Sequence, residues 1–193
     1  EAKLAEYVVS VAKKNNLEYS RDEFGNIVIR KPATPGKENL TPVVMQGHLD
    51  MVPEKNSDVV HDFDKDSIQC YVDGDWVKAK GTTLGSDNGI GVAAALAVME
   101  SEDLEHGPIE ALFTLDEETG LFGAQALKPG FVNGKILFNL DTEEEGALYI
   151  GCAGGQNTFV KFKFNQKDVP AKTTALEIKV IGLKGGHSGL DIN

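Results

Sequence analysis

Residues 81–91 read GTTLGSDNGIG and lead directly into the apolar run VAAALAVM at 92–99. The apolar run predicts a buried helix, and Asp87 stands just before it. Glycines on both sides of Asp87 admit a close approach of backbone or ligand. The segment therefore indicates a loop-to-helix junction that presents a carboxylate to a partner. The same residue type also suits the N-cap of the helix, and the two roles do not exclude each other.

Polar side chains follow three predicted apolar strands. The strands are residues 42–46, 109–115 and 135–140, and the polar residues after them are His48 and Asp50, Glu117 and Glu118, and Asp141. Open α/β sheets bind their ligands at the carboxyl ends of the strands. One imidazole and several carboxylates at this edge form the ligand set of a two-metal hydrolase.

The alternation of apolar strands with helices sets the fold class. Helical patterns cover residues 1–16, 88–100 and 121–127, between strands that are apolar throughout. This alternation predicts an α/β fold, a mostly parallel sheet with helices on both faces, in which the apolar strands are buried. A hairpin is expected over residues 68–80, with its turn at Asp73-Gly74.

The pattern changes after residue 155. Two segments of alternating polarity, 158–164 and 175–181, predict strands of a second, α+β domain. We therefore expect one domain over residues 1–154 and the beginning of another over 155–193. Glu1 begins inside a helical pattern, which indicates a piece of a longer protein.

Composition excludes several classes of partner. The 193 residues are 41% hydrophobic and carry a formal net charge of −11, which argues against nucleic acid and anionic membranes as partners. No apolar run approaches the ~18 residues that span a bilayer. Cys70 and Cys152 are too few for a disulfide framework or a thiolate zinc site, so we expect reduced cysteines and a cytoplasmic protein.

The spacing within two pairs of these residues suggests a different role for each member of the pair. His48 and Asp50 lie two apart, so on an extended segment both face the same side, and Asp50 can hold the imidazole of a metal-binding His48. A His-x-Asp pair alone is also common on surfaces and in hydrogen-bonded cores. Glu117 and Glu118 point in different directions, so one can bind a metal while the other reaches the attacking water.

Five segments in this order resemble the zinc-dependent aminoacylase/carboxypeptidase/dipeptidase family: 47–52, 81–91, 116–120, 139–143 and 185–189. The resemblance is closest to its branch of aminoacyl-histidine, or cytosol non-specific, dipeptidases and extends along nearly the whole chain. It implies the α/β catalytic domain of a zinc peptidase over residues 1–154. It also implies that residues 155–193 begin a lid or dimerisation domain.

The resemblance also implies roles for single residues. Asp87 would bridge two zinc ions, His48 and Asp141 would complete one site, and Glu118 would belong to the other. Glu117 would be the general base. Co²⁺ or Mn²⁺ are possible substitutes for Zn²⁺.

Further roles follow from the same resemblance. Asp50 would orient the metal-binding histidine, and His187 would reach over the substrate carbonyl from the lid. The peptide bond between Asp87 and Asn88 would be cis. A last metal-binding histidine would lie beyond Asn193, so the 193-residue chain by itself is expected to be inactive.

The resulting expectation is a cytoplasmic metallo-dipeptidase that hydrolyses Xaa-His and other dipeptides, with a possible homodimer through the lid domain. An N-acyl amino acid amidohydrolase with the same metals is one alternative. A metal-binding fragment without catalysis is the other, and the extra carboxylate of Glu117 argues against it.

Overall fold

The computed structural model describes residues 1–142, 144, 146–152, 154 and 158–182. The chain divides into two units, Glu1–Glu145 and Gly146–Asn193. All helices and strands of the described residues lie in the first unit.

The first unit is built on a five-stranded sheet in the order β1-β2-β6-β3-β7. β6 (Ile109–Thr114), β3 (Val43–His48) and β7 (Ile136–Asn139) run parallel to one another. β2 (Ile27–Lys31) pairs antiparallel with β6, and β1 (Glu18–Arg21) pairs antiparallel with β2. The α/β class is confirmed. β1 was not predicted, because its polar sequence EYSR becomes a strand only through its pairing with β2.

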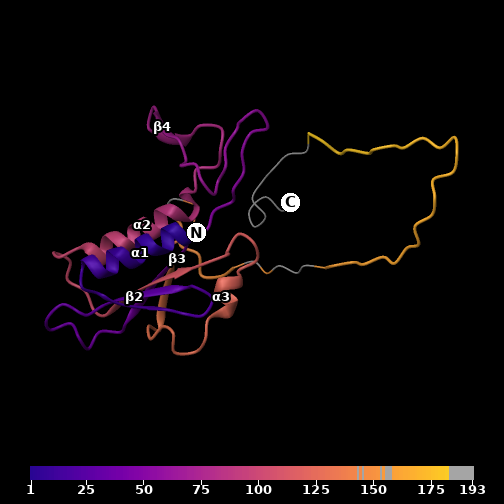
Figure 1. Ribbon diagram of the computed structural model, residues 1–193. Coiled ribbons are helices and arrows are strands. Elements are labelled where there is room, and N and C mark those ends of the chain that lie inside the picture. The colour runs from indigo at the N-terminus through magenta and orange to yellow at the C-terminus, as the bar shows by residue number, and fades with distance from the viewer. Residues whose placement is uncertain (143, 145, 153, 155–157, 183–193) are drawn as a thin grey trace. The chain divides into compact units, whose positions relative to one another are not determined.

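One face of the sheet is covered by α1 (Ala2–Lys14) and α2 (Ser86–Glu100), which lie side by side in Figure 1. Side chains of both helices and of β2 and β6 form one buried cluster, whose larger members include Val8, Ile27, Ile29, Met99 and Phe113. Among the described residues, no helix has the length and apolar character needed to cross a bilayer.

The opposite face of the sheet has a thinner cover. Val28, Val44 and Leu112 point to this side, because alternate residues of a strand face opposite ways, and Leu127, Phe131 and Val132 pack on them. The short helix α3 (Phe122–Ala126) reaches the same region, where Ala124 lines a small cavity together with Leu112 and Leu127.

The predicted burial is partly correct for α2 and wrong for β7. In α2 the buried positions recur at helical spacing, through Gly91, Val92, Ala95, Leu96 and Met99, while Ile90 on the other side is 71% exposed. β7 was expected to be buried, yet its apolar residues 136–138 are all exposed. β7 is an edge strand that pairs only with β3, and no described element covers its outer edge.

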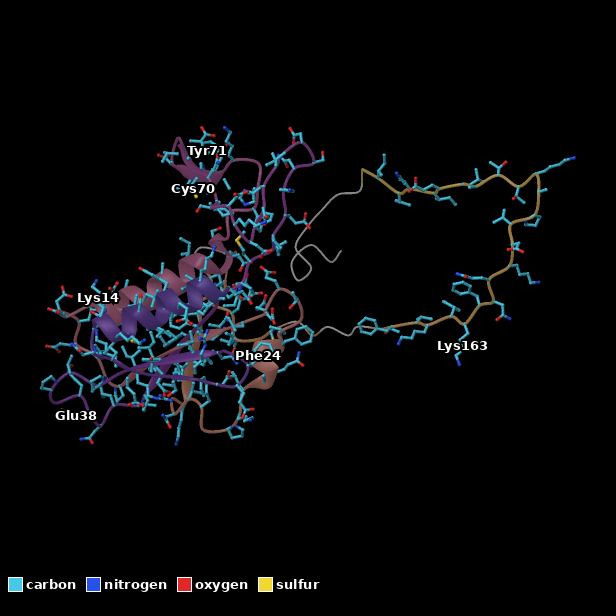
Figure 2. All side chains as sticks on the ribbon, in the orientation of Figure 1. Lys14, Phe24, Glu38, Cys70, Tyr71 and Lys163 are labelled. Carbon is cyan, nitrogen blue, oxygen red and sulfur yellow. The ribbon has the colours of Figure 1, made fainter. Side chains whose placement is uncertain are left out.

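A separate hairpin connects the sheet to α2. β4 (Cys70–Asp73) pairs antiparallel with β5 (Trp76–Ala79), with Asp73 opposite Trp76, so the predicted turn at Asp73-Gly74 is confirmed. The side chains of Cys70 and Tyr71 stand out from this hairpin into solvent (Figure 2).

The second unit contains no helix or strand within its described residues, which include 158–182. The prediction of strands at 158–164 and 175–181 is therefore wrong for this structure. A strand needs a neighbour for its backbone N–H and C=O groups. No described segment pairs with residues 158–164 or 175–181. Their apolar side chains, such as Phe159 and Ile178, are about nine-tenths exposed.

Candidate metal centre

The junction at the start of α2 departs from helical geometry. The peptide bond between Asp87 and Asn88 is cis, as the resemblance implied, and both residues have non-helical backbone angles. α2 has no side-chain cap hydrogen bond, and the carboxylate of Asp87 instead meets the imidazole of His48. In this structure Asp87 faces the site and does not cap the helix.

His48 is the last residue of β3 and stands at the centre of the site. Its side chain is 1% exposed, and Nε2 faces three carboxylates. The distances from Nε2 are 2.9 Å to Asp87 Oδ1, 3.6 Å to Asp141 Oδ1 and 4.0 Å to Glu117 Oε2. Side chains from β3, the start of α2, the end of β7 and the segment after β6 thus converge on one nitrogen atom.

Asp50 holds the other side of the imidazole. His48 Nδ1 lies 3.0 Å from the backbone oxygen of Asp50 and 3.3 Å from its Oδ1 atom. The same carboxylate accepts the backbone N–H groups of Glu117 at 3.0 Å and Glu118 at 2.9 Å. Asp50 is therefore placed to fix both the histidine and the two glutamates that follow β6.

The side chains form two overlapping groups with metal-ligand spacing. His48, Asp87 and Asp141 form one, His48, Glu117 and Glu118 form the other, and the ligand atoms of each group lie within 4.8 Å of one another. The structure thus brings together His48, Asp50, Asp87, Glu117, Glu118 and Asp141. His187 lies outside the described residues.

The acidic surroundings control the protonation of His48. Burial by itself lowers the pKa of the imidazole, but hydrogen bonds to Asp141 and Asp87 and the charges of Asp141 and Asp50 outweigh it and raise the pKa to about 10. Burial raises the pKa of Asp141, but the hydrogen bond and charge of His48 prevail and hold that pKa below its usual value.

The remaining carboxylates have raised pKa values. Burial is the largest cause for Asp87, Glu117 and Glu118, and neighbouring carboxylates add to it. Several acids crowded around one histidine lack enough positive charge, and bound divalent cations would supply it. Oxygen and imidazole nitrogen donors at this spacing suit zinc, so the residues present fit a metal centre.

Asn88 belongs to the site but was not singled out from the sequence. It is 3% exposed, and its carboxamide bonds to the ends of both β3 and β7. An asparagine after Asp87 looks like an ordinary helix start. The sequence signal that could have indicated a buried neighbour here is Gly47, which stands just before His48 and leaves room for another side chain to approach closely.

A mixed sheet with an imidazole and clustered carboxylates at the carboxyl ends of its parallel strands is the arrangement of a metal-dependent α/β enzyme. Residues 44–174 match the family described as Peptidase family M20/M25/M40. The chain belongs to this family, whose members are metal-dependent peptidases.

Individual relatives agree with the family. The chain is 54% identical over 193 residues to the cytosol non-specific dipeptidase of Escherichia coli (strain K12), covering 100% of this chain and 40% of that protein. The chain therefore spans two fifths of the length of this relative.

Solved structures show the same fold. The aminoacylhistidine dipeptidase of Vibrio alginolyticus matches with a TM-score of 0.75 and 55% identity, over 78% of this chain and 31% of that one. The aminopeptidase PepT of Bacillus cereus ATCC 10987 matches with a TM-score of 0.62 and 24% identity, over 75% of this chain and 39% of the PepT chain. At this identity the match supports the fold alone.

Proposed function

We propose that the intact protein is a metal-dependent dipeptidase that hydrolyses the peptide bond of small peptides, including Xaa-His dipeptides. The observation that carries the proposal is the convergence of two overlapping ligand groups on His48, with Glu117 beside them. The relatives at 54% and 55% identity are named as dipeptidases, which supports the same substrate class.

The proposed cofactor is a pair of zinc ions. Asp87 would bridge them, with His48 and Asp141 on one ion and Glu118 on the other. The group of His48, Asp87 and Asp141 has the spacing for the first ion. The second group consists of His48, Glu117 and Glu118. Because the proposal assigns His48 to the first ion and Glu117 to the base, Glu118 and the bridging Asp87 are left for the second ion, and the further histidine ligand that the resemblance implies is part of the proposal. When bound, such a pair lowers the pKa of water and polarises a carbonyl group.

Glu117 is the proposed general base. It would accept a proton from the attacking water as the oxygen adds to the scissile carbonyl carbon. It would then give that proton to the amine nitrogen as the C–N bond breaks. Burial raises the pKa of Glu117, which improves its ability to take up the proton.

Two residues would support the base and ligands. Asp50 accepts the N–H groups of Glu117 and Glu118 and so fixes the direction in which both side chains leave the backbone. It also lies against His48 Nδ1, which leaves Nε2 as the ligand atom. His187 would donate to the developing oxyanion from the second domain.

The proposal places this dipeptidase in the cytoplasm, with the catalytic domain over residues 1–154 and a lid domain that begins at 155. A homodimer would form through that second domain. A small open hollow beside Asp87 and Asp141, of about 330 Å³, is the proposed approach of the substrate to the site.

The test is an activity assay on the intact protein with a dipeptide and its N-acetylated analogue, each with and without a metal chelator. Hydrolysis of the free dipeptide that the chelator abolishes and zinc restores is expected. Preference for the acetylated substrate would indicate an amidohydrolase instead. Zinc binding without turnover of either substrate would indicate a metal-binding protein.

A further inference from the structure

Asn88 is an uncharged side chain enclosed by the ligands of the metal centre. It is 3% exposed and directly follows Asp87. Its backbone lies in the non-helical first turn of α2, so the side chain turns inward to the ends of the parallel strands. The hydrolytic steps give it no proton to move and no substrate atom to contact.

The carboxamide of Asn88 is fully used in hydrogen bonds between two strands. Its Oδ1 atom accepts the backbone N–H of His48 at 3.2 Å. Its Nδ2 atom donates to the backbone oxygen of Leu140 at 2.7 Å and to Asp141 Oδ1 at 2.9 Å. A single side chain thus fixes the end of β3, the residue after β7 and the direction of one ligand carboxylate.

Two glycines make the room that this side chain occupies. A Cβ atom at Gly47 would lie 2.3 Å from Asn88 Oδ1, and one at Gly91 would lie 2.7 Å from the same atom. Neither glycine has a positive φ, so backbone conformation does not require glycine at these positions. At Gly47 the close contact is with the carboxamide of Asn88 alone, whereas at Gly91 an added Cβ would first meet the backbone oxygen of Leu140, at 2.3 Å, and then this carboxamide.

We propose that Asn88 is a positioning residue that sets the Asp141 carboxylate and the spacing of the β3 and β7 ends for metal binding. The inference rests on the proposed metallo-dipeptidase function. Both amide hydrogens are needed, because Leu140 O and Asp141 Oδ1 only accept hydrogen bonds. Without them the Asp141 carboxylate keeps only its contacts with the other side chains of the site, such as His48, and metal binding must then order it further.

A buried asparagine could also serve stability alone, and the chain offers a matched control for this. Asn26 is 0% exposed, and its Oδ1 accepts the N–H of Leu115 at 3.2 Å. Its Nδ2 donates to Gly123 O at 2.9 Å and Asp22 Oδ2 at 2.7 Å. Asn26 thus has the same hydrogen-bond count and a deeper burial, but bonds to no candidate metal ligand.

The experiment compares Asn88→Ala and Asn26→Ala with the wild type in the intact enzyme. Zinc affinity is measured by competition with a chromogenic chelator, and kcat, KM and the melting temperature of the metal-free protein are measured beside it. Asn88→Ala should weaken the tighter zinc site about 10–100-fold, as loss of a residue that orients a ligand does. It should lower kcat more than it changes KM. Asn26→Ala should lower the melting temperature but keep the zinc affinity of the wild type.

Asn88→Leu provides a second variant that fills the space with a similar branched shape but no hydrogen-bonding atom. It should weaken zinc binding as Asn88→Ala does. Wild-type zinc affinity in either folded variant, or an equal loss in Asn26→Ala, would overturn the proposal. It would also fail if neither Asn88 variant folds while Asn26→Ala does, because the role would then be structural. A wild-type enzyme that binds no zinc would instead reject the proposed function itself.

Discussion

Asp50 Oδ1 accepts the backbone N–H of Glu117 at 3.0 Å. The other oxygen of the same carboxylate accepts the N–H of Glu118 at 2.9 Å. His48 Nδ1 approaches the carboxylate to 3.3 Å. The end of β3 is thereby joined to the segment after β6, which carries the proposed general base.

Asp50→Asn should lower kcat. The side-chain amide has one accepting oxygen, so one of the two backbone N–H groups would face an NH₂ donor. We expect a decrease of about 10–100-fold, typical for a residue that orients metal ligands. Steady-state kinetics with a dipeptide measure it. Asp73→Asn in the exposed hairpin is the control, and an Asp50→Asn enzyme as active as this control would contradict the role.

Glu117→Gln tests the proposed base. The amide keeps the shape of the side chain but cannot accept the proton of the attacking water, so kcat should fall about 10²–10⁴-fold. Zinc content should stay at the wild-type value, because Glu117 is not a proposed ligand. Activity assays and elemental analysis of the purified variant measure both quantities.

Asp87→Ala should lose zinc, whereas Glu117→Gln should keep it. Removal of the proposed bridge should reduce the zinc content itself, because the cations would then repel each other without a shared carboxylate. If Glu117→Gln lost zinc as Asp87→Ala does, Glu117 would be a ligand. The group that it forms with His48 and Glu118 allows this outcome.

The local sequence pattern was sufficient to predict the helices and strands that carry the site. β3, β6, α1 and α2 were expected within about two residues of their observed ends, because their apolar runs and turn signals are strong. Burial was less predictable. The apolar sequence of β7 suggested an interior strand, but burial depends on which elements pack against its outer edge, and none of the described ones does.

In the candidate site, too, some features could be predicted from the sequence and others could not. The ligands could be predicted because each stands at a strand end or helix start in a segment that resembles a known family. The role of Asn88 could not, because it depends on the distance between the ends of β3 and β7, which no local pattern contains. Likewise, the bonds from Asp50 to the two glutamate N–H groups join residues far apart in sequence.

Zinc binding near pH 7 should release about one proton. In the metal-free protein the pKa of His48 is about 10, so both ring nitrogens carry protons at neutral pH. The metal requires a free Nε2 atom, and its proton must leave. Calorimetric titrations in two buffers with different ionisation enthalpies measure the number released. No dependence of the binding enthalpy on the buffer would contradict the raised pKa.

The same raised pKa makes the metal-free protein less stable as the pH rises. The folded-state pKa of His48, about 10, exceeds its usual 6.5, so this contribution is fully present below pH 6.5 and is lost as the pH approaches 10. A tenfold change in proton affinity corresponds to about 1.4 kcal/mol, so the whole contribution amounts to several kcal/mol. Urea unfolding from pH 6 to 10 with a chelator present measures it, and a rising free energy of unfolding would contradict it.

Gly47→Ala and Gly89→Ala should change stability in opposite directions. A Cβ at Gly47 would lie 2.3 Å from Asn88 Oδ1, so the carboxamide must shift, and such overpacking costs about 1–3 kcal/mol. Gly89 lies in the helical part of α2, with nothing within 4 Å of an added Cβ, so alanine there should stabilise by up to about 1 kcal/mol. Thermal unfolding of the metal-free proteins measures both.

Because the Gly47 variant also displaces the side chain that orients Asp141, it should lose zinc affinity, whereas the Gly89 variant should keep it. Equal stability and equal zinc affinity in the two variants would show that β3 and α2 do not meet as closely as these distances require.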